Sequence, residues 1–347
     1  MLGGLSLLYG AGVFLRRLLY DAGVLTARSV DAKVVCIGNL TTGGTGKTPA
    51  VMLAAQTLRR RNQSVAILSR GYARPNGRKE VLVLNEDTDI PWTQCGDEPW
   101  MMHQALAGLS VPILVSPDRT RAAVQAAQFF NSRIIILDDG FQHRKLKRDL
   151  DIVLVNATDP FGGGWLLPLG DLREPLSSLK RAHLILLTHV DLVAPERLEE
   201  IRRELRRRNA KAPILESIHK ADFLLDVRAE KKHKLAHLQG QDVCALSGLA
   251  DPASFEDQLT RCGMKLAQRW RYPDHHRYTM AELASLEKLR RGLPLVTTFK
   301  DFTRLPAGWK KALQADVYVL SIKLDILKGR NIWTDSLLSL AGGKEAA

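Results

Sequence analysis

The segment Thr41–Thr48 constrains this chain more than any other part of its sequence. It stands between the apolar run 34–37, which we expect to be a strand, and residues 49–61, which have the pattern of a helix. Glycines let consecutive backbone N–H groups surround a phosphate chain, and the partial positive charge of a helix N-terminus adds to the attraction. We therefore interpret the segment as a phosphate-binding loop; the alternative is a glycine-rich turn followed by a helix cap. Its residues are Thr41, Thr42, Gly43, Gly44, Thr45, Gly46, Lys47 and Thr48.

Two parts of the sequence predict how this loop would hold a nucleotide. Lys47 is expected to contact the β- and γ-phosphates and Thr48 to ligate Mg²⁺, although Thr41 stands where the usual loop begins with glycine. The apolar run 134–137 leads into Asp138 and Asp139. In a P-loop fold such a strand brings a carboxylate to Mg²⁺. The alternative is a strand that ends in an acidic turn, and the sequence does not indicate which aspartate approaches the metal.

The order of apolar and helical segments predicts an α/β fold. Apolar strands alternate with helices through residues 26–208, which indicates a P-loop NTPase-type, mostly parallel sheet with helices on both faces. Residues 209–240 are polar and are expected to be a linker, and residues 241–347 a smaller α/β domain. The expected strands are 34–37, 65–69, 81–84, 113–116, 134–137, 152–155, 184–187, 243–246, 295–298 and 317–322. The expected helices are 49–61, 99–107, 118–130, 195–208, 252–262 and 280–291.

The net charge of +13 indicates that the chain binds polyanions, such as nucleotide phosphates, nucleic acid or an anionic membrane surface. No aromatic residues interleave with the arginines of 202–208, and no nucleic-acid-binding signature is present, so this run is interpreted as a solvated helix face and no nucleic-acid partner is expected. The four cysteines form no CxxC pair and no Cys/His cluster, which favours a reducing compartment.

The N-terminal residues 1–25 are expected to form an apolar helix that associates with a membrane. Residues 1–15 carry no charge and are followed by Arg16 and Arg17. This stretch is shorter than the ~20 residues that cross a bilayer, and it lacks the features of a signal peptide. Such a helix can lie among lipid head groups with its cations toward anionic lipid. The alternative is a core helix that packs on the first domain.

Asp97, in the sequence Gly96-Asp97-Glu98-Pro99, has two possible roles. As a helix N-cap it would be followed by Glu98 and Pro99 in the first turn, where both residues are favourable. As a general base it would accept the proton of an attacking hydroxyl, as the catalytic aspartate does in other phosphotransferases. The two roles are compatible, because a carboxylate at a helix N-terminus is held rigidly.

Taken together, these motifs resemble the tetraacyldisaccharide 4′-kinase family, the lipid A 4′-kinases of Gram-negative bacteria. The resemblance extends in order over most of the chain, and its blocks at 96–99 and 138–144 are specific. The matching segments are GNLT at 38–41, GGTGKT at 43–48, SRGY at 69–72, GDEP at 96–99, DDGFQHR at 138–144, LREP at 172–175, PDH at 273–275 and KD at 300–301.

The resemblance implies ATP-dependent phosphorylation of the 4′-hydroxyl of a tetraacyldisaccharide 1-phosphate, a lipid A precursor, at the cytoplasmic face of the bacterial inner membrane. It implies that Asp97 is the general base and that His275, from the second domain, is its partner. Lys47, Thr48, Asp138 and Asp139 would serve MgATP. The candidates for substrate contact are Tyr72, Glu98, Arg119, Gln142, His143 and Arg173. The sequence indicates neither the oligomeric state nor the acyl-chain preference.

Two other classes of P-loop protein remain as alternatives. One is a GTPase or a regulatory ATPase, because Thr188-His189-Val190-Asp191 is similar to the guanine-reading Thr-Lys-x-Asp motif. His189 replaces the lysine whose stem would pack on the base, so guanine specificity is poorly supported, although this strand end is still expected near the nucleotide base. The other is an ATPase that acts on nucleic acid, and the net charge is its only support.

Overall fold

The computed structural model describes residues 2–71, 80–88, 90–249, 251–274 and 276–342. The chain divides into two compact units. Unit 1 contains the residues up to His219 together with those from Leu324 onward, and unit 2 is Lys220–Lys323. The chain therefore leaves unit 1 within one strand, β8 (Ile214–Asp226), and returns to it within another, β13 (Val317–Lys328).

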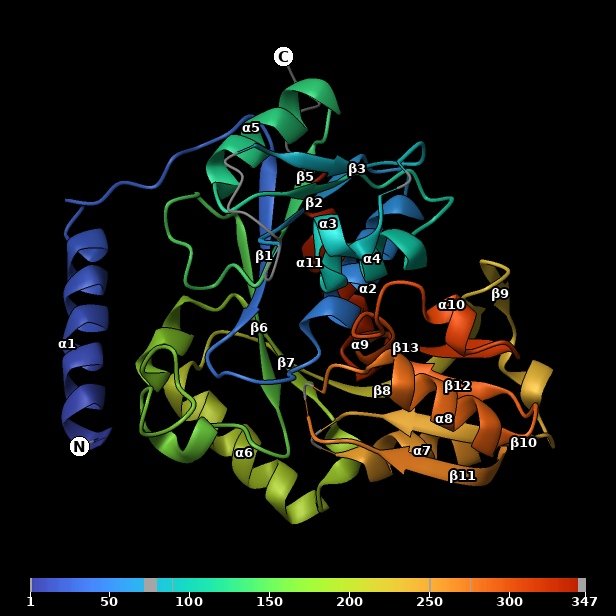
Figure 1. The fold of residues 1–347 in the computed structure, drawn as a ribbon. Coiled ribbons are helices and arrows are strands. Elements are labelled where there is room, and N and C mark those ends of the chain that lie inside the picture. The colour runs from blue at the N-terminus through green and yellow to red at the C-terminus, as the bar shows by residue number, and fades with distance from the viewer. Residues whose placement is uncertain (1, 72–79, 89, 250, 275, 343–347) are drawn as a thin grey trace. The chain divides into compact units, whose positions relative to one another are not determined.

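Unit 1 is built on a mostly parallel sheet in the strand order β8-β7-β6-β1-β5-β2-β4-β3 (Figure 1). The short β3 pairs antiparallel with β4, whereas the other neighbours run parallel. Its strands are β1 (Lys33–Asn39), β2 (Val65–Ser69), β3 (Leu82–Leu84), β4 (Ile113–Val115), β5 (Ile134–Asp138), β6 (Leu150–Asn156), β7 (Leu184–Thr188) and the first part of β8. The predicted fold class is confirmed for this unit.

Alternate residues of β1 pack on the two faces of this sheet, as expected for a strand covered on both sides. Val35 and Ile37 share one core cluster with helices α2, α4 and α11, and Cys36 lies on the other face with α6. Val34, on that same face, packs with α5. The helices are α2 (Lys47–Arg59), α4 (Asp97–Ala105), α5 (Arg119–Phe129), α6 (Pro195–Arg208) and α11 (Arg330–Leu338), and a short α3 (Trp92–Cys95) precedes α4.

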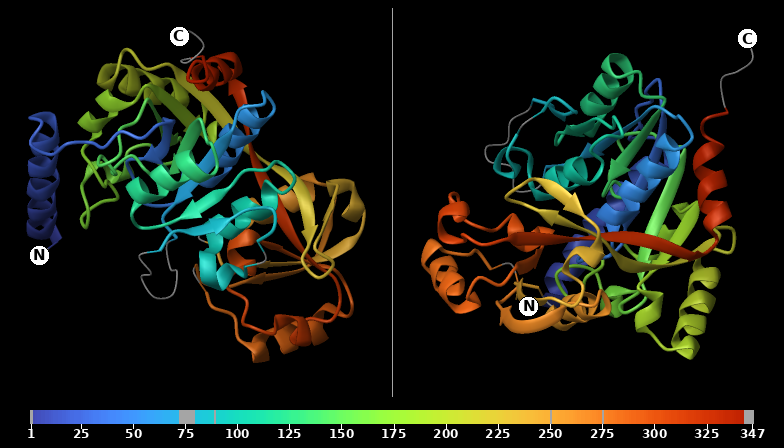
Figure 2. Two further views of the ribbon diagram at one scale, coloured as in Figure 1. Left: turned by 90° about the horizontal axis from the view of Figure 1, so that it is seen from above. Right: turned by 90° about the vertical axis from the view of Figure 1, so that its right-hand side faces the viewer.

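Unit 2 contains parallel strands in the order β11-β10-β12-β13, drawn in yellow-orange to red in Figure 2. Phe255 and Leu259 of α7 pack on Val243 and Ala245 of β10 to form its core. The end of β8 pairs antiparallel with β9 in this unit. The elements are β9 (Lys231–His233), β10 (Asp242–Ser247), α7 (Pro252–Arg261), β11 (Lys265–Arg271), α8 (Met280–Arg290), β12 (Leu295–Thr298), α9 (Phe299–Phe302) and α10 (Trp309–Ala312).

The structure divides the chain differently from the expected division. Residues 209–240, expected to be a linker, contain β8 and β9. The apolar residues near the two ends of β8 are separated by His219, Lys220 and Asp222, so a search for continuous apolar runs does not find this 13-residue strand. The end of the chain was assigned to the smaller domain, but Leu324, Ile326 and Trp333 are buried in the core of unit 1.

The N-terminal helix α1 (Leu2–Asp21) is not a core helix, so that alternative is wrong. Ser6 is the one buried residue among those described in α1, whereas Leu7 is 78% exposed and Phe14 is 65% exposed. The helix is 20 residues long and has a mean hydropathy of 1.3 over an 18-residue window, so its length and composition suffice to cross a membrane. The helix is therefore longer than the uncharged run 1–15, on which the predicted length of the apolar segment was based.

The packing of Trp333 predicts that α11 is required for the stability of unit 1. Its side chain is 1% exposed and its Nε1–H donates to Thr57 Oγ1 of α2 at 3.4 Å, where the two helices lie in contact. Trp333→Ala should lower the free energy of unfolding by about 3–5 kcal/mol in urea denaturation, because it removes a large buried ring. Ile332→Ala, at an exposed position of the same helix, is the control and should change it by less than about 0.5 kcal/mol. Equal losses in the two variants would contradict this packing.

Candidate active site

The loop between β1 and α2 has the geometry of a phosphate-binding loop. Gly46 precedes α2 with a φ of 81°, a left-handed conformation that glycine adopts without strain. Side chains from two strands hold the loop: Asn39 Nδ2 of β1 donates to Thr45 Oγ1 at 2.9 Å, and Thr188 Oγ1 of β7 donates to the Thr45 carbonyl at 3.2 Å. The loop conformation is therefore fixed by the carboxyl ends of two parallel strands.

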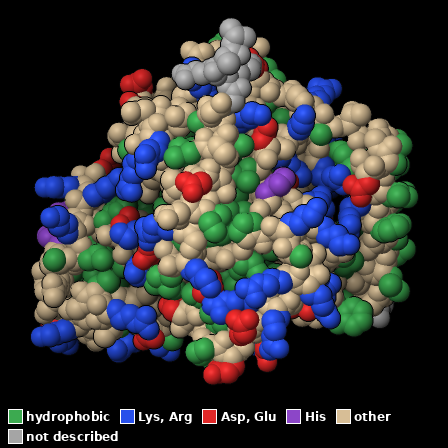
Figure 3. All heavy atoms as spheres, turned by 180° about the vertical axis from the view of Figure 1, so that it is seen from behind, with side chains coloured by type: hydrophobic (Ala, Val, Ile, Leu, Met, Phe, Trp, Pro, Cys, Tyr) green, Lys and Arg blue, Asp and Glu red, His purple; other side chains and the backbone are tan. Residues whose placement is uncertain are grey.

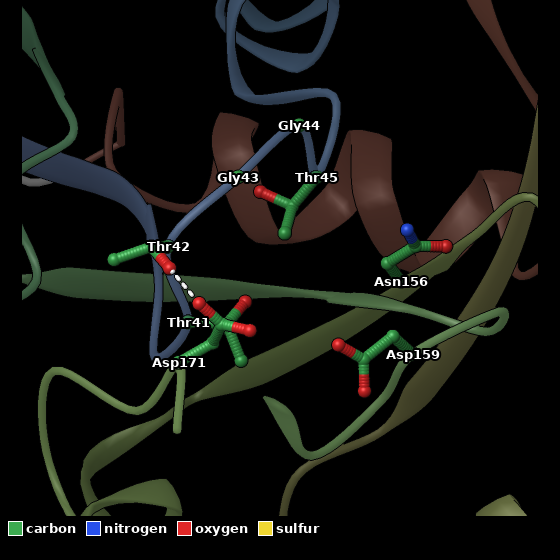
Figure 4. A pocket seen from close by; sticks show the side chains of 8 residues that line it. All are labelled: Thr41, Thr42, Gly43, Gly44, Thr45, Asn156, Asp159 and Asp171. Atoms are coloured by element: carbon green, nitrogen blue, oxygen red, sulfur yellow. Dashed lines mark hydrogen bonds between the residues drawn. The ribbon is translucent and has the colours of Figure 1, made fainter. Parts of the chain in front are cut away.

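A hollow of about 240 Å³ lies against this loop. Figure 4 shows Asn156, the last residue of β6, and Asp159, which follows the strand, across the hollow from Thr45. Thr42 Oγ1 donates to Asp171 Oδ1 at 2.6 Å at the edge of the same space. The lining residues are Thr41, Thr42, Gly43, Gly44, Thr45, Asn156, Asp159 and Asp171. The predicted loop residues thus border a space that a phosphate group can enter.

Lys47 lies in a cluster of charged and polar side chains. Its Nζ donates to Asn39 Oδ1 at 3.3 Å and lies 3.7 Å from Asp139 Oδ1. Arg173 Nη1 donates to both carboxylate oxygens of Asp139, at 3.0 and 2.8 Å. Burial would raise the pKa of Asp139, but the charges of Lys47 and Arg173 outweigh it and lower this pKa. Asp139 is therefore held ionised between two cations.

Asp138 is the last residue of β5 and its side chain is buried. Parallel pairing of β5 with β1 places it opposite Ile37, two residues before Asn39. Ser69 Oγ of β2 donates to Asp138 Oδ2 at 3.2 Å. Burial and the adjacent charge of Asp139 raise the pKa of Asp138 to about 6. Two carboxylates at this depth make a bound cation favourable.

Three predicted substrate contacts lie beside this cluster. Arg119, at the start of α5, is buried and its Nη2 donates to the Asp138 carbonyl at 3.3 Å. Gln142 Nε2 donates to the Asn39 carbonyl at 2.9 Å. Burial and the charge of Arg119 lower the pKa of His143 to about 4, so this imidazole is neutral. Arg119 Nε and His143 Nε2 are buried and have no hydrogen-bond partner among the described residues.

Arg173 is positioned by the backbone of the phosphate loop. The backbone N–H of Arg173 donates to the Leu40 carbonyl at 2.7 Å, and the backbone N–H of Thr42 donates to the Asp171 carbonyl at 2.8 Å. Leu172 and Thr41 form an antiparallel bridge between these two bonds. A short ladder thus joins the loop at 171–173 to the entrance of the phosphate loop, which explains how Arg173 reaches Asp139.

The capping interpretation of Asp97 is wrong in its detail. Helix α4 begins at Asp97 itself, and Gly96, with a φ of 97°, occupies the N-cap position. Asp97 Oδ1 instead accepts the adjacent Glu98 N–H at 2.9 Å. Part of Glu98 is exposed to solvent. The atoms around its carboxyl group nevertheless desolvate it, and this desolvation, together with the charges of Asp138 and Asp97, raises the pKa of Glu98 to about 7. Glu98 therefore belongs to the same electrostatic cluster as Asp138.

Two predicted site residues cannot be placed. Tyr72 and His275 lie outside the described residues. In unit 2, Asp301 of the matching KD segment is buried and accepts hydrogen bonds from the Gly248 N–H at 2.9 Å and from Tyr278 Oη at 3.1 Å. This carboxylate thus joins loops that follow β10, β11 and β12.

Comparison with known proteins gives the family. The family model for tetraacyldisaccharide-1-P 4′-kinase matches residues 1–340. A tetraacyldisaccharide 4′-kinase of Elusimicrobium minutum (strain Pei191) is 46% identical over 323 residues, which are 93% of this chain and 86% of that protein. This chain belongs to the tetraacyldisaccharide 4′-kinase family. A protein of the same name from Anaeromyxobacter sp. (strain K) is 41% identical over 327 residues, with the same two coverages.

A solved structure agrees with this assignment. The Aquifex aeolicus LpxK crystal structure in complex with ATP superposes with a TM-score of 0.76 at 29% identity, and the match covers 97% of this chain and 96% of that one. The predicted family, kinase class and fold are therefore confirmed. Neither the GTPase nor the regulatory ATPase alternative has support from these relatives.

A pair of histidines whose contact was not predicted from the sequence supports the phosphate loop of this family member. His219, near the middle of β8, and His189, after β7, approach through their Nδ1 atoms at 3.3 Å. Only one of these nitrogens can carry the proton between them, and burial lowers the pKa of both residues, that of His219 to about 3. A Cβ at Gly46 would collide with the ring of His219. Spacing along the chain could not reveal this contact, because the two histidines are 30 residues apart, one after β7 and the other within β8.

This contact predicts a coupling between Gly46 and His219. Gly46→Ala should weaken ATP binding by about tenfold or more, because it adds a Cβ at a positive φ and against an imidazole. In a His219→Ala background the collision is absent while the φ cost remains, so the same change should weaken binding less. Calorimetric titration of ATP into the four proteins measures the coupling. Equal effects of Gly46→Ala in both backgrounds would contradict the contact.

Proposed function

We propose that this chain transfers the γ-phosphoryl group of ATP to the 4′-hydroxyl of a tetraacyldisaccharide 1-phosphate, a lipid A precursor. The observation that carries the proposal is the convergence of Lys47, Asp138 and Asp139 at the carboxyl ends of β1 and β5. Phosphoryl transfer depends mainly on in-line positioning and on neutralisation of charge, and Lys47 would supply part of that neutralisation.

The residues present fit a magnesium ion. Thr48, Asp138 and Asp139 offer a hydroxyl and carboxylates, which are the oxygen ligands that Mg²⁺ prefers. The described residues contain no group of three or more His, Cys, Asp or Glu arranged for a metal. Mg²⁺ is usually held by one or two carboxylates together with water and substrate phosphates. When bound, the ion would neutralise charge on the transferring phosphoryl group.

The chain's own groups have the following roles in the proposed reaction. The loop N–H groups and Lys47 bind the β- and γ-phosphates and stabilise charge as the bond to the leaving oxygen breaks. Asp97 accepts the proton of the 4′-hydroxyl as its oxygen bonds to phosphorus. Arg173 holds Asp139 ionised, which keeps that carboxylate available to a cation. His275 is proposed as the partner of Asp97 on the family resemblance alone.

The substrate's own phosphate and sugar are assigned to the polar groups beside this cluster. Arg119 and His143 each have a buried nitrogen without a partner among the described residues, and both nitrogens can bond to phosphate or hydroxyl oxygens. Gln142 and Glu98 complete this set, and Tyr72 is kept as a candidate for the same pocket on the family resemblance. A tetraacylated substrate is membrane-bound, so we place the kinase at the cytoplasmic face of the inner membrane through α1.

Lys47→Ala tests the phosphate loop as the ATP site. The variant should lose nearly all transfer of labelled phosphate from ATP to the tetraacyldisaccharide 1-phosphate in detergent, because it removes the cation that contacts the β- and γ-phosphates. Lys33→Ala is the control, because Lys33 lies at the opposite end of β1 and pairs with Asp149. Transfer at the wild-type rate by Lys47→Ala, or no transfer by the wild-type protein, would contradict the proposal.

Asp97→Asn tests the general base. The kcat should fall by about 10²–10⁴-fold, because the amide cannot take the proton. The KM for ATP and the melting temperature should change little, because the amide oxygen can still accept the Glu98 N–H. Glu98→Gln is the matched control, since it removes the neighbouring carboxylate and should reduce kcat less. If Glu98→Gln shows the larger loss and Asp97→Asn remains active, the base is Glu98.

A further inference from the structure

A basic hollow lies at the surface of unit 1, away from the phosphate loop. It is formed by a 3₁₀ helix, η2 (Leu176–Arg181), and by the last turn of α6, and its volume is about 330 Å³. It is lined by Ser177, Lys180, Arg207 and Arg208. We refer to these four residues as the α6 hollow. None of them belongs to the proposed site of phosphoryl transfer.

The α6 hollow has an excess of positive charge. Arg207 Nη2 and Arg208 Nη2 both pair with the carboxylate of Glu204, each at 2.7 Å. One carboxylate therefore serves two guanidinium groups, and Lys180 adds a third cation. The side chain of Arg207 is 73% exposed, so this charge faces solvent. Such a surface attracts a phosphate group.

The α6 hollow is continuous with the apolar helix α1. Arg17 Nη1, in the last turns of α1, donates to Ser177 Oγ at 3.0 Å, so a fourth cation lies at the edge of the hollow. Leu7, Leu8 and Phe14 of α1 are exposed. Figure 3 shows Lys and Arg side chains gathered beside the column of hydrophobic side chains at its right edge, where α1 lies. An apolar element and a basic hollow thus adjoin.

We propose that the α6 hollow binds the head-group phosphate of an anionic phospholipid in the membrane that α1 enters. The binding of an apolar helix to a membrane surface is strengthened by the attraction of adjacent basic residues to anionic lipids. The hydrogen bond between Arg17 and Ser177 fixes the hollow at the charged end of α1, where head groups would lie. The last two arginines of 202–208 thus line this hollow and remain accessible to solvent. The inference rests on the proposed membrane association of the kinase.

Two triple variants with the same loss of charge test this site. The first, Lys180→Gln/Arg207→Gln/Arg208→Gln, removes the cations of the hollow. The second, Arg197→Gln/Arg203→Gln/Arg206→Gln, removes three arginines of α6 that do not line it. Binding of full-length protein is measured by flotation with vesicles of phosphatidylcholine alone and of phosphatidylcholine mixed equally with phosphatidylglycerol.

The first triple variant should partition to the mixed vesicles at least about tenfold less than wild type, because each basic residue near an anionic surface contributes about fivefold. The second should lose less than about threefold, and binding to phosphatidylcholine should be unchanged in both. An equal loss of binding in the two variants would contradict the assignment of lipid binding to the hollow, because net charge alone would then explain the binding. Absence of any loss in the first variant would also contradict it.

The failure of this inference can be distinguished from failures of the proposed function. Wild-type protein that binds neither vesicle would contradict the membrane association itself. Transfer of phosphate in detergent without anionic lipid should be the same for wild type and for both triple variants, because none of the six residues lies in the phosphate site. A loss of that transfer in the first variant alone would place the hollow in the catalytic machinery and would overturn its assignment to a membrane lipid.

Discussion

The parallel pairing of β1 with β5 is the constraint on which the rest of the site depends. Each strand ends in a functional segment, and the register that places Asp138 opposite Ile37 brings the acidic pair to the base of the phosphate loop. A buried carboxylate is costly unless cations or hydrogen bonds compensate it. Lys47, Arg119, Arg173 and Ser69 supply that compensation here from four different elements. The cations among these groups can also neutralise charge on a transferring phosphoryl group. The same charges would therefore stabilise the buried carboxylates and support phosphoryl transfer.

Much of the fold and part of the site could be predicted from the sequence, and the failures have physical causes. Strands buried on both faces, such as 65–69, appear as continuous apolar runs and were correctly located. β11 (Lys265–Arg271) was not predicted, because it lies at the sheet edge and its exposed alternate positions include the charged residues Lys265, Arg269 and Arg271. The roles of Lys47 and Asp138 followed from local motifs, whereas Asn39, Ser69 and His219 act through contacts between distant segments. No periodicity or spacing encodes such contacts.

The N-terminal helix is connected to the site as well as to the proposed membrane surface. Tyr9 Oη donates to the Arg173 carbonyl at 2.9 Å, and Arg16 Nη2 donates to the Gln142 carbonyl at 3.0 Å. Both acceptors belong to residues that surround Lys47 and Asp139. A lipid substrate would approach from the side of α1, so one helix serves as the proposed anchor and contacts the backbone of the segments that form the phosphate site. The α6 hollow also contacts this helix, because Arg17 of α1 donates a hydrogen bond to Ser177 of the hollow.

We propose that Lys47, Asp138 and Asp139 form one site for MgATP. A crystal structure of this protein with Mg²⁺ and a non-hydrolysable ATP analogue tests it most directly. We expect the β- and γ-phosphates to lie within hydrogen-bonding distance of the loop N–H groups and of Lys47 Nζ. We also expect the ion to lie between the Thr48 hydroxyl and a carboxylate of Asp138 or Asp139. Phosphates bound elsewhere, with the loop and both carboxylates uninvolved, would contradict the account.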